Sequence, residues 1–298
     1  MRVTVVGAGL MGAQIGCEYA LAGHEVALVA REAAAAEERF QRALELVQEH
    51  GLATPEQAEA AAARTSAGSD LAAFAACDLA VESLPEDLAL KAELLRVVAE
   101  ASPHAVLATN TSSLSITELG KAIGAPERTI GTHYWNPPLL MPLVEVVPGE
   151  GTAPQVVARV RETLRTLGKR SVLVERDVPG FIWNRIQMAV LREAVWIVEN
   201  GAASTDAVDE VLTYGLARRW SSIGFFQAIA LGGVGTWQRV SANLLPVLST
   251  AQELSDLRRW VGADDGGLPE VARRRDRGLA KNLLRDREVD PVPRPEEG

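Results

Sequence analysis

The sequence predicts an α/β protein in which an N-terminal, Rossmann-type doubly wound sheet is followed by an all-helical C-terminal domain. Short runs of β-branched and apolar residues alternate with helical stretches over residues 1–178. A glycine-rich turn follows the first of these runs, and strand signals largely disappear after residue 178. We therefore expect a sheet domain at 1–178, a helical domain at 179–285 and a disordered tail at 286–298.

The strands of the first domain are expected to be short and continuous, as in a sheet that is buried on both faces. They are expected at residues 2–6, 25–30, 78–82, 105–109, 129–133, 143–147 and 170–174. Helical sequence is expected at about 10–21 and through the alanine-rich stretch 33–63. This alternation predicts crossover helices and a mainly parallel sheet.

The second domain begins after Asp177-Val-Pro-Gly180. Residues 181 to about 199 form one long helical stretch, which Asn200-Gly201 would end. More helical segments follow to about residue 284, and the last residues are rich in proline and charge.

Composition excludes several classes of function. The chain has 298 residues and a net charge of −9, which argues against a nucleic-acid partner. Two cysteines, Cys17 and Cys77, make no disulfide framework. We see no run of about 18 apolar residues and no secretory signal, so we expect a cytoplasmic location without a membrane partner. We assign no metal site.

The glycine-rich turn reads Gly7-x-Gly9-x-x-Gly12, directly after a strand and at the start of a helix. In this setting Gly7 would make the tight turn, Gly9 would let a pyrophosphate approach the backbone and Gly12 would pack helix on strand. The N–H groups of Leu10 and Met11, at the start of the helix, would face the phosphates. The alternative is that these glycines serve packing only.

The end of the second expected strand bears on the choice of cofactor. A site for NAD usually has an acid here that holds the ribose 2′-hydroxyl, but the chain has Ala30 followed by Arg31. An arginine in this place can pair with a 2′-phosphate, which slightly favours NADP over NAD. In the alternative, Arg31 is solvated and Glu32 holds the ribose.

His133 ends a strand, where α/β sheets bind their ligands. Histidine suits the removal of a hydroxyl proton while hydride leaves the same carbon. Glu145 lies inside the apolar run Leu143–Val147 and needs a partner, for which His133 is the candidate. In the alternative, His133 is a hydrogen-bonded core residue.

Polar residues follow the strand at 105–109. Asn110 is assigned to the cofactor and Ser112 to the substrate oxygen, although hydroxyls in this stretch could instead cap a helix. Asn184 falls in the first turn of the long helix after the domain junction and shares a face with Met188 and Leu191. A polar residue on that apolar face suggests a role in a cleft.

These segments together resemble the 3-hydroxyacyl-CoA dehydrogenase superfamily, from Arg2 to about Trp237. The motifs occur in order at 6–12, 81–88 with Lys91, 110–116, 131–147 and 179–185. The resemblance implies His133 as the base, Glu145 as its partner, and Ser112 and Asn184 near the substrate oxygen. It also implies a homodimer formed through the helical domain, and three residues around the nicotinamide half of NAD(P): Glu86, Lys91 and Asn136.

Within the superfamily the chain is similar to the branch of L-gulonate 3-dehydrogenase, lambda-crystallin and carnitine dehydrogenase. Members that use CoA thioesters usually carry a lysine-rich helix pair, whereas residues 48–57 contain no lysine. The stretch Gly215–Trp220 matches the small-acid branch and suggests that Arg218 or Arg219 binds a substrate carboxylate. In the alternative, the arginine stacks on Trp220 at the surface. The chain departs from the branch at Ala30 and at Gly224-Phe225, where Gly-Pro is usual.

The sequence thus predicts an NAD(P)-dependent dehydrogenase that acts on the 3-hydroxyl of a small hydroxy acid or on the matching ketone. One alternative is a dehydrogenase of short-chain 3-hydroxyacyl-CoA thioesters. A further alternative is a catalytically inactive, crystallin-like dimer that binds nucleotide. The presence of His133, Glu145, Ser112 and Asn184 together argues against the inactive protein.

Overall fold

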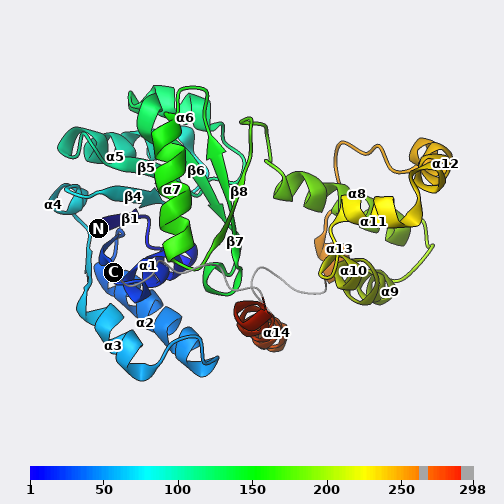
Figure 1. Cartoon of the computed structure of the whole chain (residues 1–298), viewed down its shortest axis with the longest axis horizontal. Coiled ribbons are helices and arrows are strands. Elements are labelled where there is room, and N and C mark those ends of the chain that lie inside the picture. Colours follow the sequence, from blue (N-terminus) through cyan, green and yellow to red (C-terminus); the bar gives the residue numbers. More distant parts are fainter. Residues whose placement is uncertain (262–267, 290–298) are drawn as a thin grey trace. The chain divides into compact units, whose positions relative to one another are not determined.

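The computed structural model describes residues 1–261 and 268–289 and divides into two compact units (Figure 1). The first unit contains Met1–Ile182 together with a helix that begins at Pro269, and the second contains Trp183–Leu268.

The first unit is built on one eight-stranded sheet with the order β3-β2-β1-β4-β5-β6-β7-β8. The strands are β1 (Arg2–Val6), β2 (Glu25–Val29), β3 (Thr65–Gly68), β4 (Leu79–Glu82), β5 (Val106–Thr109), β6 (Thr129–Tyr134), β7 (Leu143–Pro148) and β8 (Arg170–Leu173). All neighbours are parallel except β6 and β7, which are antiparallel. The strand order reverses between β1 and β4, and ligands of open α/β sheets bind at such a switch point.

Helices cover both faces of this sheet, which confirms the doubly wound prediction (Figure 1). One apolar core lies under α1 (Leu10–Leu21), α2 (Ala33–Glu49), α3 (Pro55–Ala63) and α7 (Pro154–Thr166). The other lies under α4 (Leu71–Phe74), α5 (Leu88–Ala101) and α6 (Ile116–Ile123). Short 3₁₀ turns, η1 (Pro126–Arg128) and η2 (Pro138–Leu140), flank β6.

The structure differs from the sequence prediction in its domain boundaries and at one edge of the sheet. Strand β3 was not expected, because Thr65–Gly68 has neither an apolar run nor an alternating pattern. Helix α14 (Pro269–Val289) belongs to the first unit, although it was assigned to the helical domain. The expected disordered tail at 286–298 is wrong for its first four residues, which are helical; residues 290–298 lie outside the described part.

In the described residues of the second unit every regular element is a helix and none is a strand, which confirms the prediction for this part of the chain. Its elements are α8 (Trp183–Glu199), α9 (Thr205–Glu210), η3 (Val211–Ala217), α10 (Arg218–Trp220), α11 (Phe225–Gly232), α12 (Val234–Leu244), η4 (Leu245–Val247) and α13 (Arg258–Val261).

In residues 1–261 and 268–289, no helix is both long enough and apolar enough to span a membrane.

Candidate active site

The glycine turn lies between β1 and α1, at the carboxyl edge of the sheet. Gly7 has φ +97°, and a Cβ there would lie 2.7 Å from the carbonyl oxygen of Ser83. A Cβ on Gly12 would lie 2.2 Å from the carbonyl oxygen of Gly7, so these two positions require glycine. A Cβ on Gly9, by contrast, would have no heavy atom within 4 Å. The open space beside Gly9, at the N-terminus of α1, fits a pyrophosphate group.

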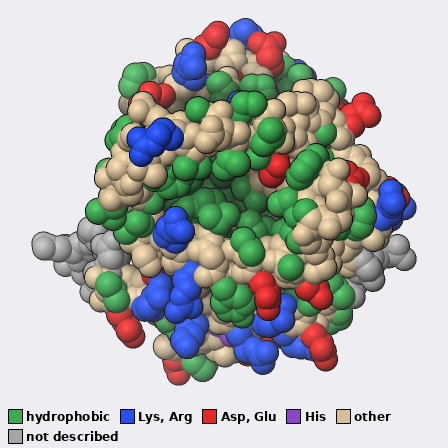
Figure 2. All heavy atoms as spheres, turned by 90° about the vertical axis from the view of Figure 1, so that its right-hand side faces the viewer, with side chains coloured by type: hydrophobic (Ala, Val, Ile, Leu, Met, Phe, Trp, Pro, Cys, Tyr) green, Lys and Arg blue, Asp and Glu red, His purple; other side chains and the backbone are tan. Residues whose placement is uncertain are grey.

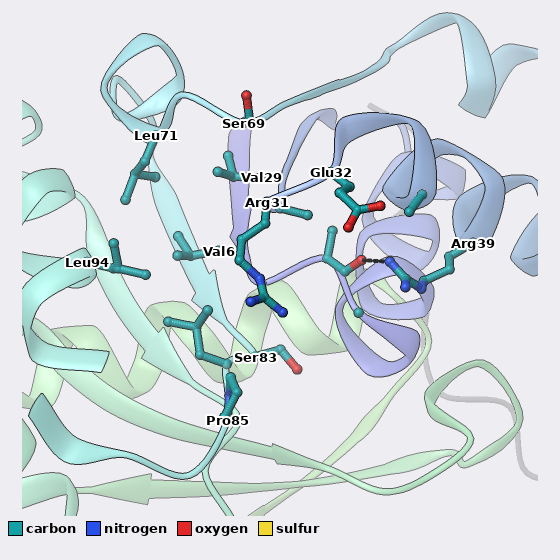
Figure 3. A pocket seen from close by; sticks show the side chains of 16 residues that line it. Val6, Val29, Arg31, Glu32, Arg39, Ser69, Leu71, Ser83, Pro85 and Leu94 are labelled. Atoms are coloured by element: carbon teal, nitrogen blue, oxygen red, sulfur yellow. Dashed lines mark hydrogen bonds between the residues drawn. The ribbon is translucent and has the colours of Figure 1, made fainter. Parts of the chain in front are cut away.

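A cavity of about 390 Å³ extends from this turn along the end of β2 (Figure 3). Figure 3 shows the Arg31 side chain reaching into it, and Glu32 and Arg39 also line it. The Arg39 guanidinium donates to the carbonyl oxygen of Ala8 at 3.5 Å, which brings it close to the glycine turn. This volume and location fit the adenosine half of a dinucleotide.

His133 and Glu145 lie directly opposite each other on the antiparallel strands β6 and β7. The His133 Nδ1 atom is 2.6 Å from Glu145 Oε2, and the two side chains are 4% and 2% exposed. An ionised carboxylate can only accept, so it selects the tautomer with the proton on Nδ1 and leaves Nε2 as an acceptor. A histidine held in this way can take a proton from a hydroxyl group.

The segment that leads into the second unit supports this pair. The backbone N–H of Ile182 donates to Glu145 Oε1 at 2.9 Å. The buried ring of Phe181 packs edge-on against the His133 imidazole, with 5.5 Å between ring centroids. Phe181 has φ +50°, a region that non-glycine residues seldom occupy, and such strain often occurs at functional sites.

The loop after β5 carries Asn110 and Ser112, as the sequence predicts. Asn110 Oδ1 accepts from the Tyr134 N–H at 2.8 Å, so it fixes the end of β6 beside His133. Ser112 is exposed, and its N–H donates to Glu86 Oε1 at 3.0 Å. These contacts bring the loop after β5 and His133 of β6 to the same edge of the sheet.

Glu86 and Lys91 come from the connection between β4 and α5. Burial raises the pKa of Glu86, but hydrogen bonds from Thr111 and Ser113 and the charge of Lys91 outweigh burial and lower that pKa to about 2. Glu86 is therefore ionised at neutral pH. The Lys91 ammonium is 1% exposed and is enclosed by protein oxygens, so its contact with a cofactor remains a prediction.

A buried lysine fixes the turn between β6 and β7, where the exposed Asn136 precedes a cis proline. Lys169 Nζ donates to the carbonyl oxygens of Pro138 and Met141, each at 2.7 Å, and pairs with Glu18 of α1. Burial, opposed by Lys169, raises the pKa of Glu18 to about 7. This anchor holds the segment that carries Asn136.

The remaining predicted site residues lie in the second unit. Asn184 is in the first turn of α8, and Arg218 and Arg219 are exposed on α10. Trp220, on which the alternative interpretation stacks an arginine, packs edge-on against Phe225 with 5.8 Å between ring centroids. The roles of Asn184 and the two arginines remain predictions.

Three residues near the site were missed by sequence reasoning: Glu82, Arg39 and Phe181. Glu82 ends a buried strand, and the argument that gave Glu145 a partner applies to it equally. Arg39 and Phe181 carry no comparable signal, because their positions depend on how α2 and the 178–182 turn pack.

No cluster of three or more metal-ligating side chains occurs in the described ranges. Hydride transfer to a nicotinamide needs a nucleotide cradle and a base at one edge of a sheet, and the first unit supplies both, so the class is a nicotinamide-dependent dehydrogenase. Residues 2–178 match the model of the 3-hydroxyacyl-CoA dehydrogenase NAD binding domain, and 180–256 match that of its C-terminal domain. The chain belongs to the 3-hydroxyacyl-CoA dehydrogenase family.

Several relatives show the range of activities in this family. The chain is 33% identical to 5-formyl-3-hydroxy-2-methylpyridine 4-carboxylate 5-dehydrogenase of Mesorhizobium japonicum, over 86% of this chain and 84% of that protein. It is 34% identical to a probable 3-hydroxybutyryl-CoA dehydrogenase of Bacillus subtilis, over 72% and 76%. A crystal structure of a 5-formyl-3-hydroxy-2-methylpyridine 4-carboxylic acid 5-dehydrogenase, described as an NAD⁺-dependent dismutase, superposes with a TM-score of 0.83, at 29% identity and 97% coverage of both chains.

Proposed function

We propose that the substrate is a small hydroxy acid with a free carboxylate, and that His133 removes the proton from its hydroxyl group. The observation that carries the proposal is the buried His133–Glu145 pair, with a 2.6 Å Nδ1–Oε2 distance, at the same sheet edge as the glycine turn. His133 Nε2 accepts the hydroxyl proton, and Glu145 stabilises the imidazolium that forms. When bound, NAD(P) supplies the hydride acceptor. Ser112 and Asn184 hold the substrate oxygen.

Charge near α2 and α3 supports a free acid over a CoA thioester. Residues 33–63 contain six glutamates, two arginines and no lysine, which would repel the phosphates of CoA. The Mesorhizobium japonicum relative, which matches most of both chains, acts by its name on a free carboxylate. A carboxylate would need a cation, and Arg218 and Arg219 are the candidates on α10.

One feature of the structure favours the thioester alternative. Helix α14 brings Arg277, Lys281 and Arg285 to a cavity of about 520 Å³ beside Glu49 and His50, at the end of α2. These cations offset part of the acidic charge of α2 and would attract the phosphates of a CoA thioester.

The test is a panel of initial rates, with NAD and NADP each combined with 3-hydroxybutyryl-CoA, free 3-hydroxybutyrate, L-gulonate, carnitine and a pyridine carboxylate that bears an aldehyde. We expect turnover of a free acid to exceed that of the thioester. Arg219→Ala should then raise the KM for the acid by about tenfold or more, because a charge-assisted contact is lost. Efficient turnover of the thioester, with Lys281→Ala raising its KM, would refute the free-acid proposal.

We also propose that the site prefers NADP to NAD. The cavity beside β2 is lined by two guanidinium groups, Arg31 and Arg39, and by one carboxylate, Glu32. The position that usually carries the ribose-binding acid is Ala30. A 2′-phosphate in this cavity would meet cations from both α2 and the end of β2.

Arg31→Ala should weaken NADPH binding by about tenfold to a hundredfold, because one charge-assisted hydrogen-bond pair is lost. NADH binding should change by less than about threefold. Titration of cofactor fluorescence with Arg31→Ala, and with Glu32→Gln as the matched control, measures both. An equal loss for the two cofactors in Arg31→Ala would refute the contact between Arg31 and a 2′-phosphate. A loss of NADH binding in Glu32→Gln would show that Glu32 holds a ribose hydroxyl.

We propose that a second copy of the chain covers the second unit. In residues 183–261 and 268, only Val195, Ala228 and Ser249 are buried. Large apolar side chains are exposed instead, including Phe226 at 83%, Leu231 at 78% and Tyr214 at 70%. Figure 2 shows hydrophobic side chains gathered around a hollow on the face that it views. Sedimentation equilibrium should give twice the chain mass, and a monomer would refute the proposal.

A further inference from the structure

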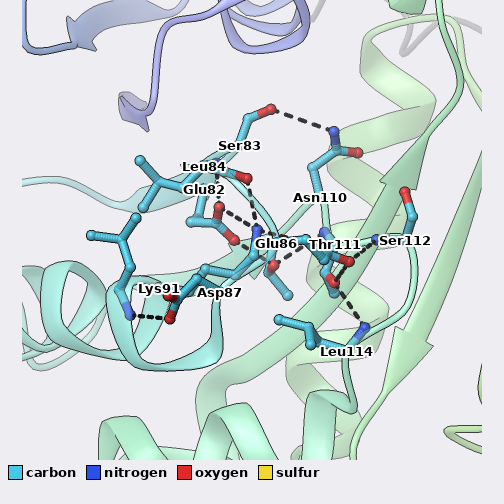
Figure 4. Close-up of polar contacts among 12 residues, drawn as sticks. Glu82, Ser83, Leu84, Glu86, Asp87, Lys91, Asn110, Thr111, Ser112 and Leu114 are labelled. Atoms are coloured by element: carbon cyan, nitrogen blue, oxygen red, sulfur yellow. Dashed lines mark hydrogen bonds and ion pairs between the residues drawn. The ribbon is translucent and has the colours of Figure 1, made fainter.

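A buried ionic network joins β4, α5 and the loop that carries Ser112 (Figure 4). The Glu82 side chain is fully buried at the end of β4, and the Lys91 side chain is 1% exposed. Such a pair contributes little net stability, because desolvation of the two charges offsets their attraction. The pair is therefore better explained by the positions that it fixes than by a contribution to stability.

The Lys91 ammonium lies close to three protein oxygens, with two of which it forms hydrogen bonds. Its Nζ atom is 2.7 Å from Glu82 Oε1, 3.0 Å from the carbonyl oxygen of Leu84 and 3.3 Å from Glu86 Oε2. Glu82 is fixed in turn, because its Oε2 accepts from the Thr109 hydroxyl at 2.6 Å and its Oε1 from the Leu84 N–H. The ammonium thus has one position relative to β4 and β5.

Glu86 connects the Lys91 ammonium to the loop after β5. One of its oxygens faces Lys91, and the other accepts from the N–H groups of Ser112 at 3.0 Å and Ser113 at 2.9 Å. The same oxygen accepts from the Thr111 and Ser113 hydroxyls at 2.5 and 2.8 Å. Figure 4 shows the Ser112 hydroxyl directed away from the network.

We infer that Glu82 and Lys91 are positioning residues, which hold Glu86 against the backbone of Ser112 and Ser113 and so aim the Ser112 hydroxyl at the substrate oxygen. This inference rests on the proposed role of Ser112. Lys91 acts here through Glu86, and the cofactor contact implied for Lys91 by the family resemblance is not required. A hydroxyl that must meet a developing charge needs a fixed backbone, since small displacements lower the rate strongly.

The test is a double-mutant cycle. The paired change Glu82→Gln with Lys91→Met removes both buried charges, and Glu86→Gln weakens the last link. We expect the paired change to lower kcat by about tenfold with little change in substrate KM. In the Glu86→Gln background the same paired change should alter kcat by less than about twofold, because the ion pair between Lys91 and residue 86 is already lost. A tenfold fall in both backgrounds, or an unaltered kcat in the paired variant, would overturn the inference.

Hydrogen exchange provides a readout that does not depend on catalysis. The amides of residues 110–115 should exchange faster in the paired variant, whereas Glu162→Gln, which removes an exposed charge from α7, should leave them unchanged. Unchanged exchange at 110–115 would contradict the inference even if Ser112 is catalytic. Faster exchange with unaltered kcat would also overturn the inference, because it would refute the role of Ser112 on which the inference rests. If the paired variant does not fold, Glu82→Asp replaces it in the cycle. This change retains the negative charge but moves it away from Lys91, because the side chain is shorter.

Discussion

Replacing His133 with alanine should lower kcat by about two to four orders of magnitude, because the hydroxyl proton loses its acceptor as hydride leaves. Cofactor affinity should change little, since His133 lies on β6 and pairs across to β7 rather than with the glycine turn. Stopped-flow or steady-state absorbance of the nicotinamide measures kcat, and fluorescence titration measures cofactor binding.

Glu145→Gln separates proton acceptance by His133 from stabilisation of the imidazolium by Glu145. The amide preserves volume and can still accept from the Ile182 N–H, but it no longer stabilises an imidazolium. We expect kcat to fall less than in His133→Ala, and the combined variant to be no slower than His133→Ala alone, because the residues act as one unit. Near-normal turnover in a folded His133→Ala variant would remove His133 from the mechanism.

The pairing of His133 with Glu145 was predictable because local sequence and sheet geometry agree. A glutamate inside an apolar strand requires a partner, and a two-strand hairpin offers few candidates. The structure places His133 and Glu145 in direct register. The glycine turn was predictable for the same reason, since Gly7 and Gly12 each meet backbone atoms that would exclude a Cβ.

Features that depend on tertiary packing were not predictable from local patterns. Strand β3 exists because it pairs with β2 at the sheet edge, and its half-exposed residues carry no strand signal of their own. Helix α14 buries only Ala280 and Leu283, and its local sequence does not say which unit it joins. Lys91 looks like an ordinary helix lysine until α5 turns it towards Glu82.

Replacing Gly9 and Gly12 with alanine, one at a time, should distinguish the glycine that binds the cofactor from the glycine that the fold requires. In Gly9→Ala the added Cβ meets nothing within 4 Å, and the backbone angles φ −74° and ψ −161° suit alanine. The free energy of unfolding without cofactor should therefore change by less than about 0.5 kcal/mol. Cofactor affinity should fall by about tenfold or more, because the methyl group occupies the space through which the pyrophosphate approaches.

Gly12→Ala should behave in the opposite way. Its Cβ would lie 2.2 Å from the carbonyl oxygen of Gly7, so α1 or the turn must shift, at a cost of about 1–3 kcal/mol. Thermal unfolding with and without NADPH measures both effects. A low melting temperature for Gly9→Ala without cofactor would show that Gly9 serves packing, and full cofactor affinity in that variant would place the pyrophosphate elsewhere. A loss confined to cofactor binding in Gly9→Ala, beside a loss of stability in Gly12→Ala, would assign one glycine to the ligand and the other to the fold.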